Sequence, residues 1–193
     1  TDQHWENVIL HHQARTAVNP VIVFLRRRMP DVFAQNVEEL GVKKKDAIDV
    51  AQSQLFFVNM FKYVTRVLNV GDFALYRAPA GVSGLRIVNS SPLSLVAGED
   101  MFRDRPKKET FFALARELSL ARPEFILPAT LGAEDFQAVF SAAVSFINPV
   151  YAHEGNTELI ERWRRKMAKH LTEDQLTALR AIVSGYLQEK HVT

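Results

Sequence analysis

The amino-acid sequence predicts a predominantly helical α+β domain, in which a small antiparallel sheet packs on helices. Apolar residues recur at helical spacing through most of the chain, three strand-like runs lie close together, and apolar residues form 47% of the sequence, enough for a core. We expect a single domain over residues 1–193, with N-terminal helices in 1–70, the sheet and core helices in 71–150, and a C-terminal helical pair in 151–193.

Helical signals dominate the first segment. Asn19-Pro20 combines a capping side chain with proline at the first helical position, and the helix that it starts is interrupted by Pro30. A second helix is expected from Asp31 to a stop at Gly41. The longest helical periodicity spans residues 48–68. Phe56, Phe57 and Met60 widen its apolar stripe, so we expect this helix to be central to the core.

The middle of the chain changes to short apolar runs separated by turn residues. Residues 73–76, 85–88 and 93–96 are the three strand candidates. Because they follow one another closely, we expect them to form a small antiparallel sheet. Residues 93–96 are the predicted edge strand, and Leu93 and Leu95 are candidate interaction residues on it.

Four helices are predicted beyond the sheet. Residues 107–121 and 133–147 have apolar residues on most sides, which is typical of buried helices. A cap at Asn156 or Thr157 starts the third helix. Thr172 and Gln175 form a capping box that starts the fourth.

Composition limits the classes of function. The absence of cysteine excludes disulfides and thiolate metal sites, and we expect a cytoplasmic protein. No run approaches the roughly 20 apolar residues of a membrane span. No glycine-rich nucleotide loop is present, so no cofactor is expected. The chain begins at Thr1 without methionine, and we expect it to be a piece of a longer protein.

The helix predicted over residues 107–121 carries the most informative feature. A zinc peptidase places His-Glu-x-x-His on such a helix, so that two imidazoles one turn apart bind the metal. Glu117 stands at the glutamate position, but Arg116 and Leu120 replace the histidines. We therefore expect neither a metal nor a catalytic residue. Glu117 should pair with a cation such as Arg122, or satisfy a buried donor.

Two alternative functions use residues near the C-terminus. His153 and Glu154 could supply unconventional ligands to a metal-dependent hydrolase, although Gly155 favours a turn there. The basic segment 162–170 could contact nucleic acid. At helical spacing, however, Trp163 should anchor the helix to the core.

The cations around Trp163 should then face water or an acidic partner. Arg162, Arg165 and Lys169 are the candidate interaction residues of this helix.

Several runs of the sequence resemble the C-terminal region of large tetratricopeptide-repeat proteins from myxobacteria and related predatory or gliding bacteria. These runs are residues 10–12, 37–46, 61–68 and 112–124. That region is itself similar to zincin-like domains, in which a small sheet precedes the helix bearing the metal motif. The resemblance implies a degenerate zincin-like core, that is, a pseudo-metalloprotease frame without metal ligands.

These features together predict a non-catalytic protein-interaction or scaffolding domain. Its protein partner is not identified by the sequence. Recognition is expected at the edge strand with Leu93 and Leu95, or in a cleft lined by Arg116 and Glu117, where a peptidase would bind an extended peptide.

Overall fold

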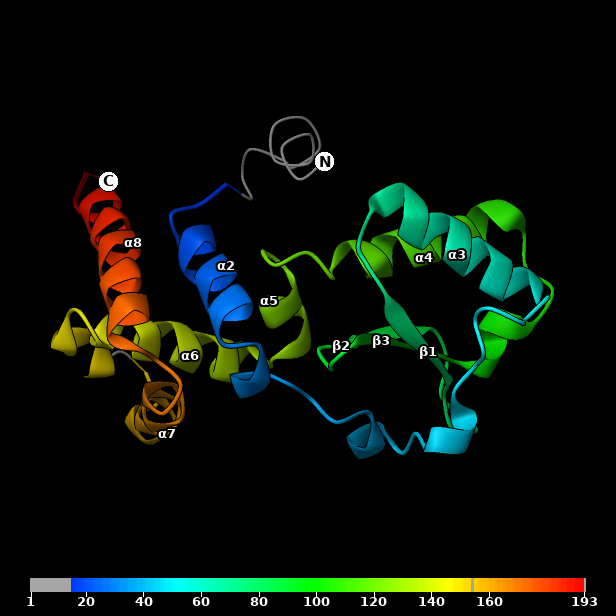
Figure 1. Ribbon diagram of the computed structural model, residues 1–193, viewed down its shortest axis with the longest axis horizontal. Coiled ribbons are helices and arrows are strands. Elements are labelled where there is room, and N and C mark those ends of the chain that lie inside the picture. Colours follow the sequence, from blue (N-terminus) through cyan, green and yellow to red (C-terminus); the bar gives the residue numbers. More distant parts are fainter. Residues whose placement is uncertain (1–14, 154, 193) are drawn as a thin grey trace. The chain divides into compact units, whose positions relative to one another are not determined.

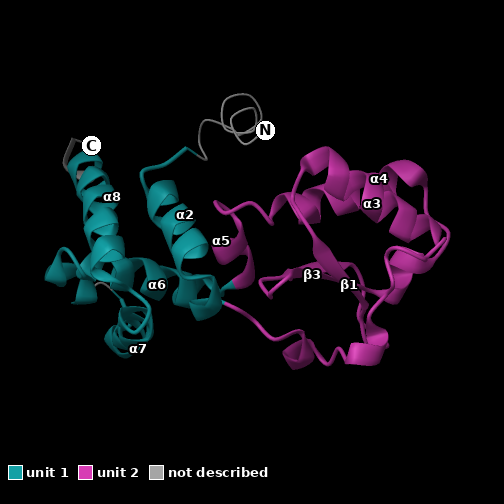
Figure 2. Cartoon of the chain, in the orientation of Figure 1, with its two compact units in different colours: residues 1–33, 131–193 teal, residues 34–130 magenta. Residues whose placement is uncertain are grey.

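The chain divides into two compact units that interleave along the sequence (Figure 2). The computed structural model describes residues 15–153 and 155–192. Unit 1 joins residues 1–33 to residues 131–193, and unit 2 comprises residues 34–130. These boundaries differ from the consecutive segments 1–70, 71–150 and 151–193 that the sequence suggested.

Unit 1 is built from helices that lie far apart in sequence (Figure 1). Helix α2 (Val18–Arg28) packs against α6 (Ala133–Ser145) and α8 (Glu173–Val192), and α6 packs against α7 (Thr157–Ala168). The boundaries differ from the expected ones because α2, near the start of the chain, buries its apolar face against the C-terminal helices.

The predicted start of the last helix is confirmed. The Gln175 amide N–H donates to Thr172 Oγ1 at 3.3 Å, and the Thr172 amide N–H donates to Gln175 Oε1 at 3.1 Å. Of the two cap residues predicted for α7, Asn156 is the one that caps it, because its Oδ1 accepts from the amide of Leu159 at 3.1 Å.

Unit 2 contains three α-helices and the sheet among its described residues. The helices are α3 (Phe56–Leu68), α4 (Lys107–Ser119) and α5 (Ile126–Thr130). Short 3₁₀ turns connect elements of both units: η3 (Pro30–Val32), η4 (Val37–Leu40), η5 (Lys44–Asp46), η6 (Glu99–Phe102) and η7 (Pro149–His153). Two 3₁₀ turns, η3 and η4, therefore replace the helix that was expected between Asp31 and Gly41.

Helix α3 starts eight residues later than the apolar periodicity suggested. Asp49 accepts hydrogen bonds from the amides of Ala51 and Gln52 through its Oδ1, at 2.9 and 3.1 Å. This carboxylate satisfies the amides locally and stabilises a turn, so the helical pattern before Phe56 is not realised as a helix.

The sheet has three strands in the order β1-β3-β2: β1 (Phe73–Arg77), β2 (Leu85–Val88) and β3 (Leu93–Ala97). β3 runs antiparallel to β2 but parallel to β1. The expected all-antiparallel sheet is therefore wrong for the β1–β3 pair. It is wrong because β3 pairs between the two earlier strands instead of following β2 at the edge.

The predicted edge position of residues 93–96 is also wrong. β3 is the central strand, and Leu95 faces both Leu75 and Ile87 in register with no measurable exposure. β3 is uncharged, whereas Arg77 and Arg86 place exposed cations on the outer strands. A central strand is paired along both edges and here is mostly buried, so the strand without charge occupies the centre, while the charges lie on the outer strands.

Helices α3 and α4 pack together and cover the sheet (Figure 1). Phe61 and Val64 of α3 and Leu118 of α4 meet Leu75 and Leu95 of the sheet in one buried cluster. The mainly helical α+β class is thus confirmed, and the sheet precedes α4 as expected. Among the described residues, no helix combines the length and apolar content that a membrane span requires.

Candidate functional site

Glu117 is buried and binds the backbone of the sheet. It projects from α4, and its Oε1 accepts a hydrogen bond from the amide of Ile87 on the outer strand β2 at 2.9 Å. Glu117 is only 9% exposed. A carboxylate that accepts from a buried amide makes a strong, charge-assisted hydrogen bond. The satisfied donor is therefore the backbone of β2, which was one of the two roles expected for Glu117.

Arg116 and Arg122 are the arginines near Glu117 in the sequence, and they differ in exposure. Arg116 is exposed. Arg122 forms a buried ion pair with Glu124, with 3.6 Å between Nε and Oε2 and each side chain only 6% exposed. The contact of Glu117 that the structure establishes is the bond from the Ile87 amide. Arg116 and Glu117 also do not share one surface, because one is exposed and the other is buried.

The alternative function, a metal-dependent hydrolase that uses His153 and Glu154, finds no supporting metal site among the described residues. Within residues 15–153 and 155–192, no group of three or more His, Cys, Asp or Glu side chains is arranged to hold a metal ion. His153 is exposed at the end of η7, and its expected partner Glu154 lies outside the described residues. The N-terminal histidines and the side chain of His191 also lie outside them.

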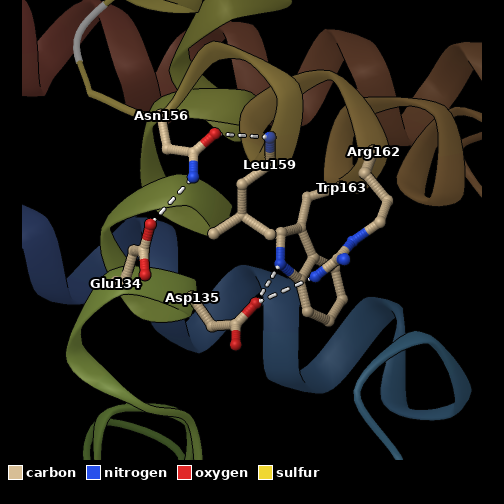
Figure 3. A network of polar contacts seen from close by, with 6 residues as sticks. All are labelled: Glu134, Asp135, Asn156, Leu159, Arg162 and Trp163. Atoms are coloured by element: carbon tan, nitrogen blue, oxygen red, sulfur yellow. Dashed lines mark hydrogen bonds and ion pairs between the residues drawn. The ribbon is translucent and has the colours of Figure 1, made fainter.

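The basic helix α7 is tied into unit 1 by a polar network (Figure 3). Asp135 of α6 accepts from Trp163 Nε1 at 2.8 Å and from Arg162 Nη2 at 3.5 Å. Asn156 donates to Glu134 at 2.8 Å while it caps α7. The polar contacts thus fix the start of α7 onto the start of α6.

Trp163 is the core anchor that the sequence predicted. It is 9% exposed and stacks on Phe33, with 5.7 Å between ring centroids. Lys166 lies 4.8 Å from the Trp163 ring centroid. The aromatic member of the basic segment is therefore buried, and it is not available for stacking on a nucleic-acid base.

Several cations of α7 have acidic or aromatic neighbours. Arg164 pairs with Glu161 at 3.4 Å and lies over the Phe146 ring. Arg165 donates to the backbone oxygen of Glu161 at 3.3 Å. The three candidate residues Arg162, Arg165 and Lys169 are all exposed. The helix thus keeps an exposed basic face, while its acidic neighbours reduce the local charge.

A second basic run, Arg26, Arg27 and Arg28, occupies the last turn of α2. Cations are favoured at this end of a helix because the helix dipole is negative there. Desolvation by burial lowers the pKa of Arg26 from its ordinary value. This cluster therefore has a structural explanation within unit 1.

An apolar groove between α3 and α4 is the surface that sequence reasoning missed. We call it the α3–α4 groove. Its volume is about 640 Å³, and it is lined by Phe56, Asn59, Met60, Tyr63, Lys107, Lys108 and Phe111. The rings of Tyr63 and Phe111 lie 6.1 Å apart across it.

Large apolar side chains stand exposed in and beside this groove. Phe56 is 50% exposed and Tyr63 is 55% exposed, and Val67, one turn beyond Tyr63 on α3, is 56% exposed. On α4, Phe112 follows Phe111 in the sequence and is 68% exposed, although it does not line the groove. The sequence signal was the width of the apolar stripe on α3, which had been interpreted as greater burial. A stripe too wide for one core contact instead leaves apolar residues on the surface.

A larger hollow, of about 780 Å³, lies near the other end of α3 and is more polar. Its lining includes Lys62, Arg66 and Asp72. Lys62 Nζ donates to the backbone oxygen of Ser53 at 3.3 Å, which ties this cation to the turn before α3. The hollow thus contains charges of both signs and lacks the uniform character of the α3–α4 groove.

No protein-family model, no curated protein and no solved structure matches this chain. The resemblance to zincin-like regions of tetratricopeptide-repeat proteins stays a prediction. Any functional assignment therefore depends on the surfaces of the two units themselves.

Proposed function

We propose that the chain is a non-catalytic protein-interaction or scaffolding domain, and that the α3–α4 groove is its main contact surface. The observation that carries this proposal is the grouping of aromatic side chains in the groove. Phe56 and Tyr63 of α3 are about half exposed, and the Phe111 ring of α4 lies 6.1 Å from that of Tyr63. Single exposed apolar residues are common, but a group of them on two adjacent helices is typical of a binding site.

The chemistry of these side chains suits protein recognition. Tyrosine combines a large apolar ring with a polar hydroxyl and is enriched among residues that dominate binding energy. Fully burying a large apolar side chain is worth about 1.5–3 kcal/mol. Phe56 and Tyr63 retain about half of their surface for a partner. Each could therefore contribute about 1 kcal/mol or more by area alone.

The sheet edges favour this groove over the strand addition that the sequence suggested. On the outer side of β2, the amide of Ile87 already donates to Glu117, and the amide of Asn89 donates to Gln35 Oε1 at 3.2 Å. On the outer side of β1, the amide of Ile48 donates to the backbone oxygen of Leu75 at 2.8 Å. Strand addition needs such backbone groups to be available, so these contacts disfavour it.

Site-specific photo-crosslinking in the native host tests the proposal. Benzoylphenylalanine would replace Tyr63 in one variant and Phe56 in another. The matched control places it at Val82, an apolar residue that is 47% exposed in the turn between β1 and β2. We expect protein adducts of the same masses from both groove positions and none of those masses from Val82. The absence of adducts from the groove positions, or identical adducts from Val82, would contradict the proposal.

A further inference from the structure

The α3–α4 groove has a charge pattern as well as an apolar surface. Its charged lining residues are Lys107 and Lys108, both exposed in the first turn of α4. Glu109, the acidic residue of the same turn, is not part of the lining. The N-terminus of a helix also carries a partial positive charge, so the helix dipole adds to the two lysines. One end of the groove is therefore positive while its walls are apolar.

The groove walls are two helices, and this determines how a partner can bind. Phe56, Asn59, Met60 and Tyr63 recur every three or four residues and so form one face of α3. Main-chain groups within a helix are bonded to one another and cannot pair with an extended strand. A partner must therefore bind through side chains. A third helix packed against two helices does this, because its side-chain ridges fit between theirs.

From these observations we propose that the α3–α4 groove binds an amphipathic α-helix of a partner protein, with apolar residues in the groove and carboxylates facing Lys107 and Lys108. This inference depends on the proposed function and adds the class of partner. The apolar stripe from Phe56 to Val67 covers twelve residues, and the eleven steps between its ends span about 16 Å of helix. A partner helix of three turns, with apolar residues at positions i, i+3 or i+4, and i+7, matches that length.

A displayed library of random 16-residue peptides, selected on the full chain and counter-selected on a Tyr63→Asp variant, tests the class of partner. The Tyr63 side chain is more than half exposed, so the aspartate is expected to be tolerated by the fold. We expect the enriched peptides to have apolar residues at helical spacing and Asp or Glu on one flank. Enrichment of proline-rich or extended sequences, of basic sequences, or of no sequence at all would overturn the inference.

Charge reversal then tests the role of the lysines. The best enriched peptide should lose about 2- to 30-fold in affinity for a Lys107→Glu/Lys108→Glu variant, the range expected for two exposed ion pairs. The same variant should gain affinity for a version of the peptide with Lys in place of its carboxylates. The matched control is Lys44→Glu/Lys45→Glu, which reverses two exposed charges on η5 and should leave the affinity unchanged. Equal affinity for both reversal variants would overturn the inference.

The remaining outcomes separate this inference from the proposed function. Crosslinks at Tyr63 without any enriched helical peptide would keep the proposed function and reject the helical partner. Failure of both experiments would reject both proposals. Concentration-dependent dimerisation that Tyr63→Asp abolishes would identify a second copy of this chain as the occupant. Binding to vesicles of phosphatidylserine and phosphatidylcholine, lost in the same variant, would identify a membrane surface. Either result would overturn the inference.

Discussion

Replacement of Glu117 by alanine should destabilise unit 2, because it removes the acceptor of a buried amide. The bond from the Ile87 amide to Glu117 Oε1 is 2.9 Å long and lies within the protein. A hydrogen bond to a charged group contributes about 1.5–3 kcal/mol, and an amide left unsatisfied by the change costs a similar amount. We therefore expect Glu117→Ala to lower the free energy of unfolding of unit 2 by about 2 kcal/mol.

The side-chain amide of Glu117→Gln still offers an oxygen acceptor, so this variant should lose about 1 kcal/mol or less. Arg116→Ala is the matched control, since Arg116 is exposed on the same helix. A surface change of this kind is usually neutral within about 0.5 kcal/mol. From the most to the least stable variant, the order should therefore be Arg116→Ala, Glu117→Gln and Glu117→Ala.

Amide hydrogen exchange at Ile87 is the appropriate assay. Among the described residues the tryptophan is Trp163 of unit 1, so tryptophan fluorescence is not the reporter of choice for unit 2. A loss of about 1.5–3 kcal/mol corresponds to an exchange rate that is about 10- to 100-fold faster. Unchanged exchange at Ile87 in Glu117→Ala would refute the structural role assigned to this carboxylate.

Two further predictions concern the stability of each unit. In unit 1, Asp135→Ala removes the acceptor of Trp163 Nε1 and should cost about 1–2 kcal/mol, measured by urea unfolding followed by tryptophan fluorescence; an unchanged midpoint would contradict the anchoring role. In unit 2, Gly98→Ala places a methyl group 2.6 Å from Ser83 Cα and should destabilise by about 1–3 kcal/mol. In unit 1, Gly132→Ala meets nothing within 4 Å and should lower the melting temperature less. Equal melting temperatures for the two glycine variants would show that the close approach at Gly98 is not a real constraint.

Local sequence signals predicted most of the helices and failed where a side chain competes with the helix. The capping box at Thr172 and the cap at Asn156 were identified because each depends on residues three positions apart. The start of α3 was missed because Asp49 satisfies two amides in a turn that apolar periodicity cannot reveal. The start of a helix can therefore be predicted only when side-chain hydrogen bonds to the backbone are considered together with the apolar spacing.

Strand order and unit composition depend on long-range packing, which the sequence did not reveal. The apolar character of residues 93–97 is compatible with a buried central strand, yet residues 93–96 were expected at an edge. Likewise, no local pattern indicates that α2 belongs with α8, more than 140 residues later. Contacts of this kind depend on the fit of complete surfaces rather than on spacing within one segment.

The candidate site was predicted only in part, because the sequence did not show which of its apolar residues are buried and which are exposed. Glu117 was correctly expected to have a structural bond, and Trp163 to be an anchor. Leu95 was expected at a binding edge but is fully buried. Phe56 was expected to widen the core contact of α3 but is half exposed. An apolar residue alone does not show whether it meets the core or a partner.

The central claim is that the α3–α4 groove binds another protein, and crosslinking from Tyr63 measures this most directly. The yield of adducts from benzoylphenylalanine at Tyr63 would be compared with the yield at Val82 in the same cells. We predict discrete adducts at Tyr63 that decrease when Phe56→Asp is introduced into the same chain, and no such adducts at Val82. Equal yields at the two positions, or adducts at Tyr63 that Phe56→Asp leaves unchanged, would contradict the claim.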